Sequence, residues 1–490
     1  MSKLNFEYVP LTFISDKQEI KKQIRNTLIL IYLFEKYNNP VRLEKLIEGT
    51  QYGYNASALQ SGNNKFLRIS DIHESKVEWD TVPYCNCDDE ATYLLKDEDI
   101  LIARTGGTTG KSFKISNPPK RSIYAGYLIR IRAKAEVNPD YIYLFLHSFA
   151  YWSQIVNLNE RNFRPKANAE NLKSLILPDC PKTVQDEIVK ISQGKKLKGY
   201  EDLFQKIETA LVAYDKTQEV ESLLEEQLNN VEKLNQSILQ EAVQGKLVKQ
   251  DIKDEPAIEL LKRIRAEKEK AGKKEKPLPP IKMEEIPFEI PKNWMWCRLG
   301  EITNYGTSPK ADPTDLKNDT WVLDLEDIEK TTSHLLCKIR FNERNSLSTK
   351  SVFKNGDVLY SKLRPYLDKV IVANEDGVCT TEILPLKCYG GLNPYYLMYS
   401  LKRADFLKYV NSVTKGMKMP RLGTKEGQIA LIPLPPVLEQ KRIVTEIEKQ
   451  LEKTKQLKEH IIANQQATEQ LLKALLHQAF EVKEKEEVEG

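Results

Sequence analysis

The stretch Ala103–Ser112, with the sequence ARTGGTTGKS, has the residue types of a phosphate-binding loop. A P-loop needs a glycine, four further residues and then Gly-Lys-Ser or Gly-Lys-Thr, and its backbone amides cradle the phosphate. Counting back from Gly110 puts Thr105 where the first glycine is required. Pro118 and Pro119 then interrupt the segment in which the phosphate-binding helix should begin. These departures argue against a nucleotide-hydrolysing site.

Two other kinds of active site are suggested by short motifs, and neither is complete. Asn117-Pro118-Pro119 resembles the Asn-Pro-Pro-aromatic motif of adenine methyltransferases, but the fourth residue is Lys120, and no glycine-rich turn for S-adenosylmethionine is suitably placed. Aspartate pairs of the kind that nucleases use lie near expected strand ends, where caps and turns explain them. These pairs are Asp97 with Asp99, and Asp324 with Asp327. We predict no catalytic site and no enzyme activity of this chain alone.

The bulk composition places further limits on function. The 490 residues predict two to four domains, and 74 Lys and Arg against 70 Asp and Glu leave a net charge of +4, so any contact with nucleic acid must be local. Seven cysteines show no disulfide framework, and the spacing of Cys85 and Cys87 does not fit a zinc site. The apolar run Leu28–Phe34 is too short to cross a bilayer and predicts a buried helix. We expect a soluble, cytoplasmic protein with no bound metal and no membrane contact.

The elements that must position any site are duplicated along the chain. Val41-Arg-Leu43 recurs 256 residues later as Cys297-Arg-Leu299, and Asp99–Ile102 recurs 258 residues later as Asp357–Tyr360. Each half begins with short runs of β-forming residues bounded by turn residues and closes with a long charged helix. The predicted fold class is α+β: two similar strand-rich globular domains in tandem, each followed by a long helix.

Heptad patterns in the two long helices predict that they pair as an antiparallel coiled coil. The apolar positions follow alternating spacings of four and three residues, with a polar residue inside each pattern. A separate packing of each helix on its own domain is the alternative. The predicted seam or partner-binding residues are Val220, Leu224, Gln227, Val231, Leu234 and Ile238 in the first helix, and Leu457, Ile461, Asn464, Thr468, Leu471 and Leu475 in the second.

The predicted domain organisation follows from the repeat and from shifts in composition. The first helical segment is longer than the second, and Gly194 and Gly199 predict an inserted turn within it. Ala266–Met283, a charged and then proline-rich stretch between the halves, predicts a flexible, exposed linker. The predicted segments are a helical extension (1–40), a first domain (41–180), a central helical spacer (181–250), the linker (251–290), a second domain (291–435), a C-terminal helical spacer (436–482) and a disordered tail (483–490).

Four stretches of the sequence carry recognisable motifs. Ile290–Ile302 opens the second domain, and Gln240–Val248 closes the first long helix. The other two are Leu434–Ile443 and Gly356–Tyr360. Together with the half-length repeat, they resemble the DNA-specificity (S) subunit of type I restriction–modification systems, and the resemblance covers roughly residues 41 to 480. The chain departs from the family pattern in its N-terminal extension and in its longer first helical segment.

The resemblance implies the function, the partners and the cofactors. Such subunits carry two target-recognition domains, each of which reads one half of a bipartite site in double-stranded DNA. Their helices set the spacing and dock two methyltransferase (modification) subunits, which restriction (motor-endonuclease) subunits join. The family has no catalytic centre in this subunit, so S-adenosylmethionine, ATP and magnesium are expected on the partner subunits and no cofactor on this chain.

The repeat also accounts for the glycine-rich stretch Ala103–Ser112. Its counterpart in the second half is Ser361–Lys369, which is rich in Lys, Arg and Tyr. Loops that read different half-sites can differ in this way, because base edges demand different donors and acceptors. The candidate DNA-binding residues are Tyr52, Tyr54, Arg104, Thr105, Thr108, Thr109, Lys111, Arg161, Arg164 and Lys166 in the first half, and Lys310, Lys362, Arg364, Tyr366, Lys369, Lys415, Lys418 and Arg421 in the second.

The sequence leaves open a second hypothesis, in which the chain is a scaffold protein and not a reader of DNA sequence. A scaffold of two globules on a coiled-coil stalk would share the repeat and the helices without reading DNA sequence. The two hypotheses differ in binding, because a scaffold predicts DNA binding that ignores sequence or is absent.

Overall fold

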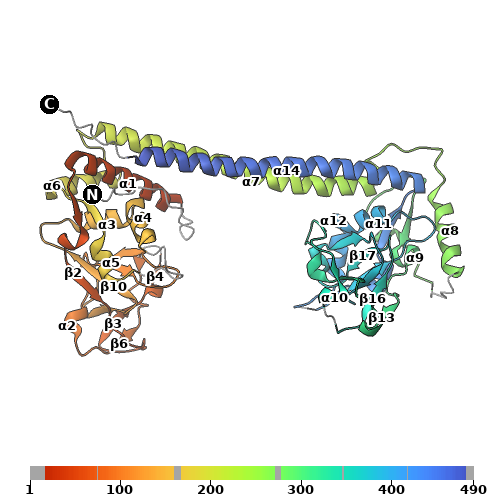
Figure 1. Cartoon of the computed structure of the whole chain (residues 1–490), viewed down its shortest axis with the longest axis horizontal. Coiled ribbons are helices and arrows are strands. Elements are labelled where there is room, and N and C mark those ends of the chain that lie inside the picture. The colour runs from red at the N-terminus through yellow and green to blue at the C-terminus, as the bar shows by residue number, and fades with distance from the viewer. Residues whose placement is uncertain are drawn as a thin grey trace. The chain divides into compact units, whose positions relative to one another are not determined.

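The structure is a computed structural model that describes residues 17–73, 76–158, 167–270, 277–344, 347–416 and 418–481. The chain forms two compact units. Unit 1 contains the described residues up to Leu223 together with those from Asn464 onward, and unit 2 runs from Leu224 to Ala463. Figure 1 labels many of the helices and strands of both units.

Unit 1 builds its strand-rich domain from short sheets with helices beside them. Its largest sheet has the strand order β2-β10-β7-β8, and a smaller sheet has the order β6-β3-β9. The strands are β1 (Pro40–Arg42), β2 (Ile47–Tyr52), β3 (Asn64–Leu67), β4 (Ile72–His73), β5 (Lys76–Val77), β6 (Tyr84–Cys85), β7 (Ile100–Ala103), β8 (Ser112–Lys114), β9 (Ser122–Tyr124), β10 (Leu128–Ala133) and β11 (Ile176–Pro178). The helices of the domain are α2 (Glu90–Tyr93), α3 (Pro139–Leu146), α4 (Phe149–Asn157) and α5 (Ala169–Ser174).

Unit 2 repeats this plan with different sheet sizes. A five-stranded sheet has the order β13-β16-β19-β14-β15, and a three-stranded sheet has the order β18-β17-β20. The strands are β12 (Met295–Arg298), β13 (Lys310–Ala311), β14 (Trp321–Leu323), β15 (Ile339–Arg340), β16 (Lys350–Phe353), β17 (Val358–Ser361), β18 (Val370–Val372), β19 (Gly377–Cys379), β20 (Ile383–Leu386) and β21 (Leu431–Leu434). The helices beside them are α9 (Leu299–Ile302), α10 (Phe341–Arg344), α11 (Pro394–Lys402), α12 (Ala404–Val413) and α13 (Thr424–Ile429).

The internal repeat is confirmed by hydrogen bonds that recur at matched positions. In unit 1 the hydroxyl of Tyr141 donates to the carbonyl of Pro178 (2.5 Å), and in unit 2 Tyr396 donates to Pro433 (2.7 Å). The first and last strands of each domain pair in antiparallel fashion, β1 with β11 and β12 with β21. Each domain is therefore closed by its own two ends, which explains how one scaffold can occur twice in one chain.

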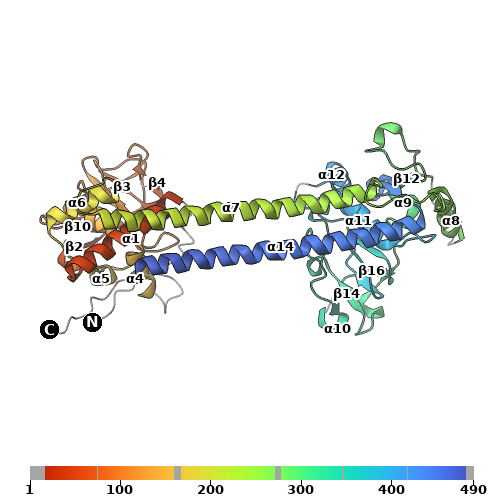
Figure 2. The ribbon, with the colours of Figure 1, turned by 90° about the horizontal axis from the view of Figure 1, so that it is seen from above.

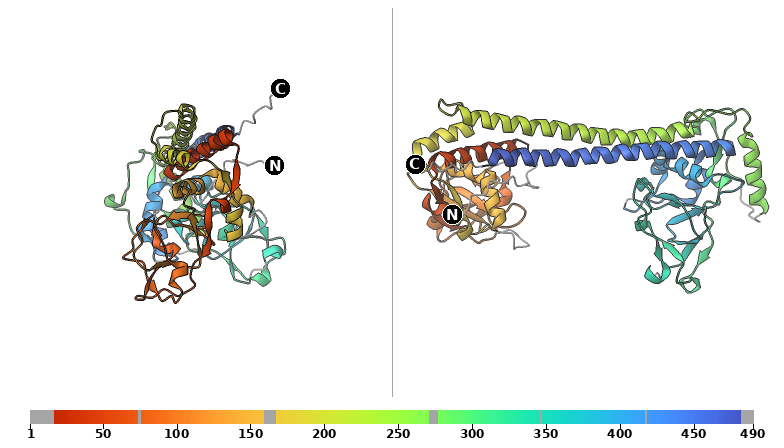
Figure 3. Two further views of the ribbon diagram at one scale, coloured as in Figure 1. Left: turned by 90° about the vertical axis from the view of Figure 1, so that its left-hand side faces the viewer. Right: turned by 45° about the horizontal axis from the view of Figure 1, so that its top comes forward.

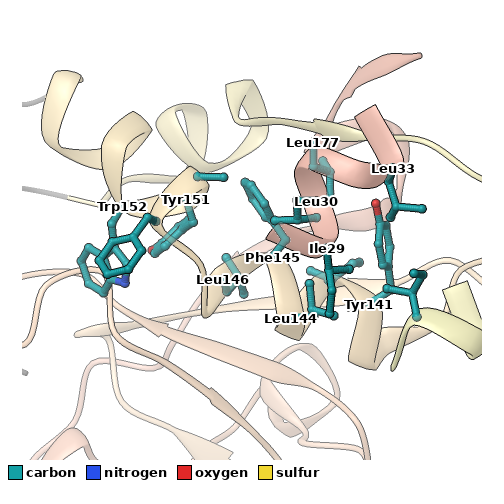
Figure 4. Packing of buried hydrophobic residues seen from close by; sticks show 14 of the residues in the cluster. Ile29, Leu30, Leu33, Tyr141, Leu144, Phe145, Leu146, Tyr151, Trp152 and Leu177 are labelled. Carbon is teal, nitrogen blue, oxygen red and sulfur yellow. The ribbon is translucent and has the colours of Figure 1, made fainter. Parts of the chain in front are cut away.

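The N-terminal extension is a helix, α1 (Lys17–Tyr37), and it completes the core of unit 1. The predicted burial of its apolar run is confirmed, since Ile29, Leu30 and Leu33 have no exposed surface. Figure 4 shows these side chains beside aromatic and aliphatic residues of α3, α4 and β11. Among the described residues, no helix combines the length and the apolar character needed to cross a membrane.

The inserted turn in the first helical segment is confirmed. Helix α6 (Lys182–Ser192) ends before Gly194 and Gly199, and α7 (Glu201–Val243) begins after them. Both glycines have φ near +90°, a conformation that side chains with a Cβ rarely adopt. The second half has no such break, so α14 (Val437–Phe480) runs as one helix.

Helices α7 and α14 pack against each other in antiparallel fashion, and Figures 2 and 3 show them side by side. In unit 1, Tyr214 of α7 shares a buried cluster with Leu472 and Leu476 of α14. In unit 2, α7 continues with Leu224, Leu228 and Val231, which surround Ile461. The hydroxyl of Thr454 then donates to the side-chain oxygen of Asn235 (2.6 Å). Residue numbers rise along α7 as they fall along α14, as expected for an antiparallel pair.

The packing corrects the predicted register at alternate positions. Leu224, Val231, Ile238 and Ile461 are buried as predicted, and Thr468 and Leu475 are half-buried. The predicted seam positions that lie exposed are Val220, Gln227, Leu234, Leu457, Asn464 and Leu471. The predicted and the observed heptad patterns agree at every seventh residue, and at the positions in between they differ by one residue. The prediction favoured Leu234 because leucine is apolar. In the structure the neighbouring Asn235 faces the seam instead, where its side-chain oxygen accepts a hydrogen bond from Thr454.

The predicted linker segment contains a docked helix, α8 (Ala257–Lys270), so the prediction that Ala266–Met283 is flexible and exposed is wrong over residues 266–270. Leu260, Leu261 and Ile264 are buried in the core of unit 2. The ammonium group of Lys268 is buried as well and donates to the carbonyls of Gly300 and Thr303. The apolar spacing of three and four residues was present in the sequence, but the surrounding charges concealed it.

Candidate nucleic-acid interface

In unit 1 the structure brings together loops that lie far apart in the sequence. Arg104 follows β7 and lies exposed, with its guanidinium carbon 4.8 Å from the centre of the Tyr52 ring at the end of β2. The hydroxyl of Tyr52 accepts a hydrogen bond from the amide of Ala169 (3.1 Å), and the amide of Ala167 donates to the carbonyl of Arg104 (3.2 Å). The β2 end, the β7–β8 loop and the segment before α5 therefore form one cluster. A guanidinium group held against a ring can present its donors to a base edge or a phosphate.

Within the β7–β8 loop, the predicted threonines differ in their surroundings. Thr105 and Thr108 are half-buried. Thr109 is buried, and its hydroxyl donates to the carbonyl of Gly106 (2.8 Å), which closes the turn. We therefore assign Thr109 to the structure of the loop. Lys111 is exposed at the far end.

The side chain of Tyr54 has different neighbours from that of Tyr52. Its ring packs 5.2 Å from that of Tyr93, against a small buried cluster. Between the two tyrosines, a Cβ atom at Gly53 would lie 2.2 Å from the carbonyl oxygen of Ala125. The carbonyl of Tyr54 accepts a hydrogen bond from the amide of Gly126 (2.9 Å).

Unit 2 brings together the corresponding loops. The amide of Arg364 in the β17–β18 loop donates to the carbonyl of Pro420 (2.8 Å), and that of Leu422 donates to the carbonyl of Lys362 (2.9 Å). The second bond is the counterpart of the bond from Ala167 to Arg104 in unit 1. Arg364 and Tyr366 are exposed on this loop.

A polar cavity of about 400 Å³ opens between these loops and the segment before β13. Lys310 and Lys362 both line it, and among the residues that the structure describes no carboxylate does. Its lining residues are Gly306, Thr307, Ser308, Pro309, Lys310, Lys362, Thr381, Leu384, Leu422 and Thr424. The ammonium group of Lys310 donates to the hydroxyl oxygen of Ser351 (2.7 Å). Two lysines among hydroxyl-bearing residues suit an anionic or acceptor-rich ligand, such as a phosphate or a guanine edge.

Several predicted cations of unit 2 already have partners within the protein. The ammonium group of Lys369 donates to the carbonyl of Leu325 (2.7 Å), and burial lowers its pKa. The guanidinium of Arg421 is 3.1 Å from the carboxylate of Glu382. Lys415 forms a more exposed pair with Glu426 (3.2 Å). Lys369 therefore stabilises its loop, whereas the other two ion pairs lie at the surface, where water screens them.

The remaining predicted site residues divide into two groups. Lys418 is exposed beside Arg421 in the loop before α13. Arg161, Arg164 and Lys166 lie outside the described residues.

Sequence reasoning missed one aromatic residue at the unit 1 cluster. Tyr127 has 68% of its surface exposed, and its carbonyl accepts a hydrogen bond from the amide of Arg104 (2.9 Å). It follows Gly126 in the turn between β9 and β10. Gly126-Tyr127, a glycine followed by an aromatic residue between two strand-like runs, is the sequence feature that could have indicated this loop as a candidate.

Comparisons with known proteins agree with the resemblance. Two Escherichia coli proteins are similar to this chain: the type I restriction enzyme EcoEI specificity subunit is 32% identical over 280 residues, and the EcoAI specificity subunit is 33% identical over 270 residues. Each match covers 51% of this chain and 45% of the relative, so the chain spans about half the length of the curated relatives it matches. No protein-family model matches the chain.

A solved structure supports the fold over nearly the whole chain. It comes from work on complex assembly and conformational transition of the type I restriction–modification system, and it covers 90% of this chain and 97% of its own. The TM-score is 0.51 at 18% sequence identity, which is evidence for the fold. The similarity of this chain to the specificity subunits of type I restriction–modification systems, first indicated by its motifs and its repeat, is thereby confirmed.

Proposed function

We propose that this chain is the non-catalytic DNA-specificity subunit of a type I restriction–modification complex and acts in the cytoplasm. Each strand-rich domain would insert its loop cluster into the major groove and read one half of a bipartite target. Lysines in the clusters would supply salt-dependent affinity for phosphates, and arginines would discriminate between bases.

The observation that carries this proposal is the pair of matched loop clusters with different side chains. The backbone bond from Ala167 to Arg104 in unit 1 and that from Leu422 to Lys362 in unit 2 hold equivalent loops together. The side chains above them differ, with Arg104 on Tyr52 in one domain and a cavity lined by two lysines in the other. Two copies of one scaffold with unlike reading surfaces suit a target with two unlike halves.

The long helices supply the remaining part of the proposal. Exposed apolar side chains such as Leu223, Leu234 and Leu457 lie on α7 and α14 outside the seam. We propose that the helices set the spacing between the half-sites and dock two methyltransferase subunits, which restriction subunits join. S-adenosylmethionine, ATP and magnesium would then act on those partners.

The proposal is tested by co-expressing the chain with a cognate methyltransferase subunit and mapping methylated adenines in host DNA by single-molecule sequencing. We expect one split motif. Arg104→Ala should relax the first half of the motif and Arg364→Asn the second half. Discrimination should fall roughly ten- to a hundredfold at one base pair, the value of a bidentate arginine contact. Asparagine is chosen at position 364 because it tolerates the positive φ found there.

Matched controls are available in both units. Arg42 of β1 and Lys354, which forms an exposed pair with Asp376, carry charge outside the clusters, so Arg42→Ala and Lys354→Met should leave the motif unchanged. An active methyltransferase that modifies no discrete motif would refute sequence reading and favour a two-globule scaffold. A continuous, undivided motif would retain DNA reading but refute the bipartite mechanism.

A further inference from the structure

The β7–β8 loop of unit 1 and the β17–β18 loop of unit 2 reverse the chain through the same two left-handed positions. In unit 1 these positions are Gly106 and Gly110, with φ of 88° and 85°. In unit 2, 258 residues later, they are Arg364 and Asp368, with φ of 47° and 50°. Left-handed backbone is freely available to glycine, less favourable for aspartate and asparagine, and unfavourable for arginine. Unit 2 therefore holds its loop in a conformation that Arg364 disfavours and that Asp368 adopts less readily than a glycine does.

A buried ion pair holds the second of these positions. The side chain of Asp368 is only 6% exposed, and its carboxylate accepts a hydrogen bond from the ammonium group of Lys402 on α11 (2.9 Å). The same ammonium group donates to the carbonyl of Thr331 (2.9 Å) and to the hydroxyl oxygen of Ser333 (2.7 Å). The Ser333 hydroxyl donates in turn to the carbonyl of Asp368 (2.7 Å). One lysine thus joins the loop, the turn after β14 and a helix.

A contribution to the stability of the folded protein does not by itself explain why Asp368 and Lys402 form a buried ion pair. Burial raises the pKa of Asp368 to about 6 although Lys402 is adjacent, so the loss of hydration outweighs the attraction between the two charges. Buried ion pairs are commonly no more stabilising than apolar side chains of similar size, and their clearest effect is to select one geometry.

Unit 1 shows how the turn is held without an ion pair. A Cβ atom at Gly110 would lie 2.9 Å from the ring of Trp152, and the hydroxyl of Tyr151 donates to the carbonyl of Gly110 (2.7 Å). Both aromatic rings are visible in Figure 4. Aromatic packing and a glycine therefore replace the charged pair in unit 1.

Between its two strained positions, the unit 2 loop presents the side chains that distinguish it from the unit 1 loop. Arg364 is exposed, and Tyr366 has 51% of its surface exposed. Pro365 between them is buried and restricts the backbone further. Where these two side chains point depends on the backbone angles at positions 364 and 368.

We propose that Lys402 and Asp368 are positioning residues for target reading by the second domain. Their buried ion pair holds the β17–β18 loop in the strained turn that presents Arg364 and Tyr366 to DNA. This inference rests on the proposed function. It adds a determinant of specificity that lies beneath the reading surface and does not touch DNA.

The test uses the full chain in complex with its methyltransferase subunit. Lys402→Met should lower discrimination in the second half of the motif at least tenfold and leave the first half unchanged. The double variant Lys402→Met/Asp368→Gly removes both charges and also the strain. We expect it to recover the melting temperature of the purified chain without recovering second-half discrimination. Lys354→Met, which breaks an exposed Lys–Asp pair of the same unit, is the matched control.

The outcomes separate positioning from stability. A double variant whose second-half discrimination is within twofold of the original would overturn the inference. Asp368→Asn serves as a second variant if the double variant stays unstable, because asparagine fills the same space and accepts the positive φ. An Asp368→Asn chain that reads the second half as well as the original would overturn the inference too. Absence of any split motif with the unmodified chain would overturn the proposed function itself.

Discussion

At the scale of single residues, the two domains present their arginines in different ways. Arg104 is held by its contact with the ring of Tyr52, whose hydroxyl is itself fixed by the amide of Ala169. Arg364 is held through its backbone, at a positive φ and by a bond from its amide to the carbonyl of Pro420. A pre-organised guanidinium loses less conformational freedom when it meets a base than a free side chain does.

The buried carboxylate of Asp368 predicts a pH dependence of stability. Burial raises its folded pKa to about 6, from 3.8 for an unperturbed aspartate, so the folded protein keeps this proton over a range in which the unfolded chain has released it. The contribution of Asp368 to stability is therefore largest below pH 4 and is lost as the pH rises through 6. Relative to Asp368→Asn, the original chain should lose roughly 2 to 3 kcal/mol of unfolding free energy between pH 4 and pH 7.

This difference is measured by urea unfolding of both proteins across that pH range. The titratable groups that face Asp368 are Lys402 of α11, whose pKa burial lowers, and Tyr360 of β17, whose pKa burial raises. Comparing the two proteins cancels the titration of the other carboxylates. A constant difference from pH 4 to pH 7 would contradict the assignment of a raised pKa.

At the scale of elements, the two long helices pack through positions spaced alternately by four and three residues. Along α7 these positions are Ala210, Tyr214, Thr217, Glu221, Leu224, Leu228, Val231, Asn235, Ile238 and Ala242, all of them buried or half-buried. The polar contact between Asn235 and Thr454 stands where two apolar side chains would otherwise meet. Polar pairs of this kind lower stability and select one register.

Asn235→Ala removes one partner of this contact within unit 2. We expect a loss of about 1 kcal/mol in the free energy of unfolding, the usual net value of a hydrogen bond between side chains. Urea unfolding followed by circular dichroism provides the measurement. Gln227→Ala is the matched control, because Gln227 lies exposed on the same helix, and its unfolding free energy should change by less than about 0.5 kcal/mol. Equal losses in both variants would show that the contact has no specific effect.

At the scale of the whole molecule, each compact unit is assembled from both halves of the sequence. Unit 1 takes the end of α14, whose Leu472, Leu476 and Phe480 join its core, and unit 2 takes the end of α7, including Ile238 and Ala242. An antiparallel helix pair requires this exchange, because each helix begins in one unit and ends in the other. Neither half of the chain therefore carries all the residues of its own core.

If the helices set the spacing between half-sites, lengthening both of them should lengthen the spacer of the DNA motif. Seven residues inserted after Leu223 in α7 and seven after Ala463 in α14 preserve the heptad pattern. The helices gain roughly 10 Å at about 1.5 Å per residue. That length corresponds to about three base pairs at ~3.4 Å each. Methylation mapping should show a spacer longer by about this number, and an unchanged spacer would refute the role of the helices.

Much of the fold and part of the site could be predicted from the sequence. The repeat, the strand-rich domains and the long helices depend on local patterns that the chain displays directly. Loops such as those around Arg104 and Arg364 were found because matched strands precede them. The partners of Arg421 and Lys369 could not be found in this way, because Glu382 and Leu325 are distant in the sequence.

The sequence by itself therefore determined the strand-rich domains, their duplication and the two long helices, and it indicated the loops that we propose to bind DNA, because these follow from spacing and composition over short stretches. Only the tertiary structure decided which neighbouring residues face the helix seam, that α8 is docked and that a buried lysine lies beneath the β17–β18 loop. These features depend on contacts between distant segments, where burial and charge pairing can override local preference. The choice between Leu234 and Asn235 at the seam is such a case, since Thr454 on the other helix makes the polar residue acceptable.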